Sequence, residues 1–140
     1  MKDISDTLVY KGVEYPLVFN INVLEEIQQE YGTFAKWLDL ITGDVEERRT
    51  GETVEVETPT GEIVTVEKGE PDIKAIKFAY FQMINEGLDI ENDEKGEKRE
   101  PVTMRFIGRM FTEIGLDEMV KKLNTLALES NQSGETPKNG

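Results

Sequence analysis

The sequence predicts one mainly helical α+β domain, with about five helices, an N-terminal β-hairpin and a second hairpin inserted as an arm. Three observations support this class. Apolar residues recur at helical spacing in several segments, and two short alternating runs flank turn residues. The length of 140 residues suits a single core. We expect the domain to span residues 1–130, with the arm at residues 52–68, and the polar residues 131–140 to form a disordered tail.

The chain opens with a predicted hairpin. Its two runs, TLVY and VEYPLVF, flank Lys11 and Gly12, and glycine accepts the positive φ of a tight turn. Pro16 lies in the second run and has no N–H to donate to a strand ladder. The second strand should therefore be an edge strand or an irregular one.

Two helices should follow the hairpin. The segment NINVLEEIQQEYG offers Asn20 or Asn22 as N-cap and Gly32 as the stop. Thr33 then caps a second helix that ends at Gly43. Their apolar residues keep helical spacing: Leu24, Ile27 and Tyr31 in the first helix, and Phe34, Trp37, Leu38 and Ile41 in the second.

A charged connection at residues 43–53 leads into the predicted arm, VEVETPTGEIVTVE. A three-residue loop with a bulge would put Pro59 at the second turn position and Gly61 in the left-handed conformation. A two-residue loop would instead pair Val56 with Ile63 and split the valines between the two faces. The valine pattern therefore favours the bulged loop.

In the bulged register, Val56 faces Val64 and Val54 faces Val66, so all four valines share one face. We call these four residues the valine face. A lone hairpin is marginally stable in water. We therefore expect the valine face to pack on the domain or on a neighbouring subunit, which makes it a candidate partner-binding surface.

The third helix should start with Pro71 at its first position and run to about residue 86. Its core face should consist of Ile73, Ile76, Ala79, Tyr80, Met83 and Ile84. The other side carries four residues that we call the phenylalanine patch: Lys74, Lys77, Phe78 and Phe81. Two phenylalanines there indicate either a helix that is buried all round or a surface that binds a partner.

A charged loop is expected at residues 85–100, after which Pro101 should begin the fourth helix. That helix should end at Gly115, and a fifth should run from Leu116 to Ser130. Their apolar stripes are Ile107, Met110, Phe111 and Ile114 in the fourth, and Leu116, Met119, Val120, Leu123, Leu126 and Ala127 in the fifth.

Composition excludes several classes of function. The chain has no histidine and no cysteine, so imidazole bases, Ser-His and Cys-His pairs and thiolate zinc sites are unavailable, and we expect no enzymatic activity and no cofactor. A net charge of -13 argues against nucleic-acid and anionic-membrane partners. No apolar run approaches the ~20 residues of a membrane span, and no signal peptide is evident, so we expect a cytoplasmic protein.

One acidic spacing resembles a calcium site. If Asp89 is position 1 of a twelve-residue EF-hand loop, Glu91, Asp93 and Glu100 fall at positions 3, 5 and 12. Position 6 is Glu94, although the sharp turn there needs glycine. We therefore interpret this segment as a solvated acidic loop and expect no metal.

Three segments together carry a family resemblance: YPLVFNINVLEEIQQEYGTFAKW, EPDIKAIKFAYFQMINEGLDIENDEKGEKRE and IGRMFTEIGLDEMVKKLNTLALES. In this order, over most of residues 13–130, they resemble the tail assembly chaperones of long-tailed phages and prophages of Gram-positive bacteria. The resemblance implies a non-enzymatic protein that coats the tape measure protein, helps recruit tail tube subunits and is absent from the mature virion. The arm lies where the resemblance is weakest, which suggests an insertion.

Two other classes of function are compatible with parts of the sequence. A structural tail component, such as a tube or connector protein, would suit the same setting, but tube proteins are rich in β-structure. An acidic inhibitor that mimics nucleic acid would suit the net charge, but the acidic residues are scattered through caps, loops and strands. Self-association is also compatible with the sequence.

Overall fold

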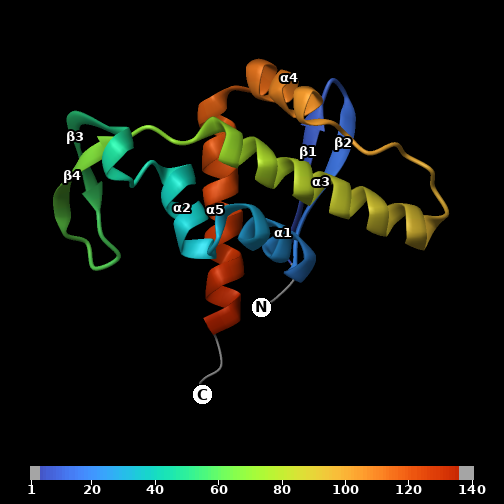
Figure 1. The fold of residues 1–140 in the computed structure, drawn as a ribbon, viewed down its shortest axis with the longest axis horizontal. Helices are drawn as coiled ribbons and strands as arrows, with labels where there is room; N and C mark the ends of the chain where they lie inside the picture. The colour runs from blue at the N-terminus through green and yellow to red at the C-terminus, as the bar shows by residue number, and fades with distance from the viewer. Residues whose placement is uncertain (1–3, 136–140) are drawn as a thin grey trace.

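The computed structural model describes residues 4–135 and confirms a mainly helical α+β fold with two antiparallel hairpins. In Figure 1, α3 crosses the middle of the molecule, with α4 above it, α1 and α2 below it, and the first hairpin running past it from the α4 side to the α1 side. The elements are β1 (Ile4–Tyr10), β2 (Val13–Phe19), α1 (Ile21–Tyr31), α2 (Phe34–Thr42), η1 (Glu46–Arg48), β3 (Arg49–Glu57), β4 (Ile63–Gly69), α3 (Ile73–Lys95), α4 (Met104–Ile114) and α5 (Leu116–Glu135).

The first hairpin has the predicted two-residue turn. Lys11 and Gly12 both take positive φ, of 52° and 77°, which suits a type I′ turn between twisted strands. Strand β1 pairs only with β2, so Pro16 does sit in an edge strand, opposite Thr7. One side of this hairpin supplies Leu8, Tyr10, Leu17 and Phe19 to the core.

Helices α1 and α2 begin and end as predicted. The Asn20 side chain accepts a hydrogen bond from the Val23 N–H at 3.2 Å, and Thr33 accepts one from the Lys36 N–H at 3.0 Å. Gly32 and Gly43 end the two helices with positive φ.

Helix α3 differs from its prediction at both ends. Asp72 is its N-cap, with Oδ1 accepting from the Ala75 N–H at 3.1 Å, so Pro71 lies outside the helix. The helix continues to Lys95, so the loop predicted at residues 85–100 is wrong for residues 85–95. Glutamate and lysine are good helix formers on a solvated face, and the lack of an apolar period in residues 85–95 concealed the helix.

Gly87 lies just past the predicted end of this helix, and the structure gives it a packing role. It is buried in α3 where β2 crosses the helix, and a Cβ added to it would lie 2.7 Å from both Cβ and Cγ of Pro16. The following Leu88 is also buried in the core. Gly87 therefore permits the close approach of strand and helix instead of ending the helix.

Helix α4 begins later than predicted. Thr103 caps it by accepting a hydrogen bond from the Phe106 N–H at 3.1 Å, whereas Pro101 lies in the preceding irregular segment. That segment is tied to α3 because the Asn85 side chain exchanges two hydrogen bonds with the Val102 backbone, at 2.8 and 3.1 Å. Asn92 does the same with Arg99, at 3.0 and 3.1 Å.

Helix α5 follows Gly115 as predicted but extends to Glu135. The structure places residues 131–135 of the predicted tail in α5, and positions 136–140 lie outside the described residues. Polar composition alone does not distinguish the last turns of a helix from a tail.

The core surrounds α3 and collects buried side chains from the first hairpin and all five α-helices. The Trp37 indole N–H donates to the Ala75 carbonyl at 3.3 Å, and the Tyr80 hydroxyl donates to the Met119 carbonyl at 2.6 Å. Ile73 is an exception to the predicted core face, since it is 48% exposed at the first residue of α3. The described arm residues contribute nothing to this buried core.

Candidate functional site

The arm is the feature that the fold leaves without an internal role. Strands β3 and β4 pair with the register predicted from the valines, Val54 with Val66 and Val56 with Val64. The loop is also the predicted one, because the Thr58 N–H donates to the Glu62 carbonyl at 2.8 Å and Gly61 has a φ of 90°. This geometry confirms the predicted valine pairs, and it places Val54, Val56 and Val64 on one face of the hairpin.

The valine face is not covered by the domain. Val54, Val56 and Val64 are 40%, 41% and 37% exposed, and every residue of β3 is exposed. The side chain of Val66 lies outside what the structure describes. Ile63, on the opposite face, is 61% exposed. Packing on the domain, one of the two expected arrangements, is therefore wrong for the valines that the structure describes.

The base of the arm is held against the domain, although its strands are exposed. Gly43 and Gly69 touch so closely that a Cβ on either would clash with the backbone of the other. Arg48 adds hydrogen bonds from its guanidinium to the carbonyls of Glu70 and Pro71, at 2.9 and 3.3 Å. Figure 1 shows the resulting arrangement, with the arm at the left end of the molecule, away from the helices around α3.

The phenylalanine patch is partly covered within the chain. Phe78 and Phe81 are half-buried against the core, and the Phe78 ring meets Tyr31 of α1 edge-on at 5.6 Å. Lys74 is exposed at the start of α3. The two rings therefore present less free surface than the valine face.

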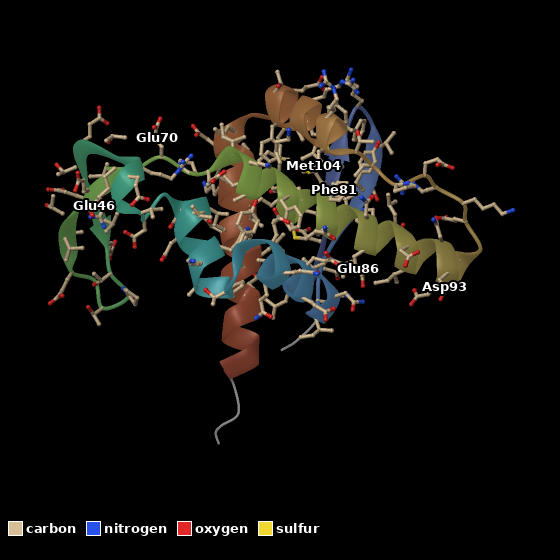
Figure 2. The ribbon with its side chains drawn as sticks, in the orientation of Figure 1. Glu46, Glu70, Phe81, Glu86, Asp93 and Met104 are labelled. Carbon is tan, nitrogen blue, oxygen red and sulfur yellow. The ribbon has the colours of Figure 1, made fainter. Side chains whose placement is uncertain are left out.

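The residues of the phenylalanine patch lie on two different sides of α3. The Lys77 ammonium lies against α4, since a Cβ added to Gly108 would be 3.2 Å from it. Phe81 lies one helical turn after Lys77 and one turn before Asn85, and the Asn85 amide donates to the Val102 carbonyl just before α4. Phe81 is therefore on the side of α3 that faces α4, and Figure 2 labels it between these two helices. The phenylalanine patch is thus divided between a contact with α1 and a contact with α4.

A second surface, which the sequence reasoning missed, lies between β2 and α4. We call it the cationic groove and define it by Val13, Tyr15, Arg99, Phe106 and Arg109, which line an open groove of about 460 Å³. Its remaining lining residues are Glu100, Pro101, Val102 and Thr103. A signal was available, because three of the five arginines fall within residues 99–109 of a chain with a net charge of -13.

The cationic groove is built from aromatic and guanidinium groups in contact. The Phe106 ring lies 5.4 Å from Tyr10 and 5.7 Å from Tyr15, measured between centroids. The Arg99 guanidinium stacks 5.2 Å over Tyr15 and donates to the Glu14 carbonyl at 3.1 Å. Arg109 is exposed and makes no ion pair with the described residues.

The acidic residues considered for calcium do not form a loop. Asp89, Glu91 and Asp93 lie on α3, and Glu86, one turn earlier, accepts hydrogen bonds from the Asn20 and Asn22 side chains at 2.8 and 2.9 Å. Among the residues whose side chains the structure describes, no group of three acidic side chains has the geometry to hold a metal ion. None of the described helices has both the length and the apolar character needed to cross a membrane.

Comparisons of the chain with protein-family models, with curated proteins and with solved structures found no match. The family resemblance stated from the sequence therefore stays a prediction.

Proposed function

We propose that this chain is a non-enzymatic tail assembly chaperone of a phage or prophage, which acts in the host cytoplasm by binding the tape measure protein and helping to recruit tail tube subunits. The resemblance of three segments to that family supplies the identity of the partners. The observation that supports a binding role is the valine face, an apolar surface on a fixed arm whose described members, Val54, Val56 and Val64, are exposed.

A chaperone of this kind needs apolar contact surface together with charge that keeps the complex from precipitating. The arm combines both properties. Its valines alternate with glutamates, and the whole chain carries a net charge of -13. A long, helical tape measure protein would otherwise expose apolar residues during assembly, and a protein without catalytic turnover is sufficient to cover them.

The test begins with the neighbouring gene. We expect the gene next to this one to be a very long reading frame that encodes a helical protein, and a different neighbour would contradict the proposal. A fragment of that reading frame should be coexpressed with the chain, and the fraction of the fragment recovered in the supernatant measured. We expect the chain to raise this fraction, and we expect binding of the purified fragment to persist at high salt because apolar contacts are not screened.

The decisive variant combines Val54→Ser, Val56→Ser and Val64→Ser, which we call the arm variant. It should no longer raise the recovered fraction, while circular dichroism still reports a folded, helical chain. Ile63→Ser is the matched control, because Ile63 is an exposed apolar residue on the opposite face of the same hairpin. Equal recovery with wild type and the arm variant would refute a role for the valine face.

A further inference from the structure

We propose that the cationic groove binds a short acidic segment of another protein, in which one apolar side chain lies between two carboxylates. The partner is identified by the chemistry of the groove alone. The inference goes beyond the proposed function, because the groove contains no residue of the arm and its ligand does not depend on the tape measure protein.

Charge is the first reason to expect an acidic ligand. Residues 95–109 contain five lysines and arginines against two glutamates, in a chain whose net charge is -13. Such a locally positive groove attracts carboxylates and repels cationic partners. A nucleic acid or an anionic membrane is a poorer ligand, because its many phosphates would also meet the acidic surface around the groove.

Apolar surface is the second reason, because the rings of the groove connect its two cations. The Arg99 guanidinium stacks on the Tyr15 ring, and that ring contacts Phe106. Arg109 follows Phe106 by one turn of α4. Val13, two residues before Tyr15 on the same side of β2, is 45% exposed in the same groove. The groove therefore presents a guanidinium, then apolar groups, then a second guanidinium.

This order of groups specifies the form of the ligand. In an extended segment, side chains at positions i, i+2 and i+4 point to the same side, and the outer two lie about 13 Å apart. Carboxylates at i and i+4, with an apolar side chain at i+2, would meet the groups of the groove in the same order. The groove, of about 460 Å³, falls in the size range of small-ligand sites, so it suits one such segment.

The two arginines differ in how firmly they are held. The Arg99 guanidinium donates to the Glu14 carbonyl at 3.1 Å and lies 3.8 Å from the Glu91 carboxylate. A guanidinium that is already positioned loses less conformational freedom when it binds a carboxylate. Arg109 is exposed and has no ion pair with the described residues, so its replacement disturbs the ligand more than the fold.

The test titrates the isotope-labelled chain with the synthetic peptide GEAFAEG, blocked at both ends, and follows the NMR chemical shifts. The shifts should concentrate in residues 13–15 and 99–109. Two matched peptides separate the contributions. GQAFAQG lacks the carboxylates and GEASAEG lacks the ring, and each should bind roughly tenfold more weakly or worse.

Variants of the chain then identify the groups that bind. Arg109→Glu should weaken binding of GEAFAEG by roughly tenfold or more. Arg105→Glu is its matched control, since Arg105 is an exposed arginine of the same helix that does not line the groove. Val13→Ser should also weaken binding. Its control is Val9→Ser, because Val9 is 56% exposed on the opposite face of the same hairpin. Circular dichroism should report the same helix content for every variant.

Several results would overturn the inference. They are an absence of shifts in the groove at millimolar peptide, equal binding of GEASAEG, which would indicate a site for simple anions, and equal effects of Arg105→Glu and Arg109→Glu. Groove shifts that appear when the chain is concentrated without peptide would show a second copy as the occupant and would overturn it too.

The outcome is separate from that of the proposed function. The arm variant should bind GEAFAEG as wild type does, since its changes lie outside the groove. If the peptide fails to bind while the chain still keeps the tape measure fragment in the supernatant, the groove inference is wrong and the proposed function stands. If the peptide binds but the fragment is not protected, the reverse holds.

Discussion

Replacing Gly87 by alanine should destabilise the protein, although alanine is the better helix former. An added Cβ would lie 2.7 Å from two ring carbons of Pro16, which is too close for a normal contact. The proline ring is rigid and belongs to a paired strand, so relief requires β2 and α3 to separate. Overpacking of this kind costs about 1–3 kcal/mol, and the helix propensity gained offsets about 1 kcal/mol of it.

We therefore expect Gly87→Ala to lower the free energy of unfolding by up to about 2 kcal/mol and Tm by up to roughly 8 °C, measured by urea and thermal denaturation. Gly108→Ala is the control. The Cβ added there meets the mobile end of Lys77 at 3.2 Å, so the propensity gain of about 1 kcal/mol should be retained. Stabilisation of both variants by similar amounts would refute the close crossing of β2 over α3.

Three further predictions concern the core. Tyr80→Phe removes the hydrogen bond to the Met119 carbonyl and should lower the free energy of unfolding by about 1–3 kcal/mol in a urea titration; no change would show that the bond is not needed. Burial raises the pKa of Tyr80 above its usual value near 10, so its contribution to stability is complete below about pH 10 and declines above it, where the unfolded chain ionises first. Stability curves at about pH 9 and about pH 11 should show a smaller decline for Tyr80→Phe than for wild type. The double variant Phe78→Ser, Phe81→Ser should lower the free energy of unfolding by at least ~2 kcal/mol, because both rings pack on the core. An unchanged Tm together with a loss of partner binding would instead show that the phenylalanine patch is a contact surface.

Local signals predicted much of this fold because they act over a few residues. The caps at Asn20 and Thr33, the stops at Gly32 and Gly43, and the loop that ends at Gly61 follow from hydrogen bonds and backbone angles within one turn. The valine register followed in the same way, since only one loop length puts the four valines on one face.

The failures involve contacts between distant segments. Nothing near Gly87 shows that Pro16, far away in the sequence, packs against it, so the continuation of α3 through this crossing was not predicted. Pro71 and Pro101 were expected to begin helices, but Asp72 and Thr103 are the caps because their side chains reach the backbone N–H three residues later.

The two candidate surfaces also show which features depend on local sequence and which depend on contacts between distant segments. Alternation alone predicted the composition of the valine face, but whether the domain would cover it depended on where the arm leaves the body. The cationic groove needed β2 and the segment before α4 to meet, which no local pattern reports. A concentration of arginines in an acidic sequence was the one clue to it.

Hydrogen–deuterium exchange of the arm tests the central claim most directly. Amide exchange should be compared in the chain alone, at low concentration, and in its complex with the tape measure fragment. The account predicts slower exchange across residues 49–69 in the complex, because a free two-stranded hairpin opens readily and a covered one does not. Unchanged exchange in the arm, with protection appearing only elsewhere in the chain, would contradict the arm as the binding element.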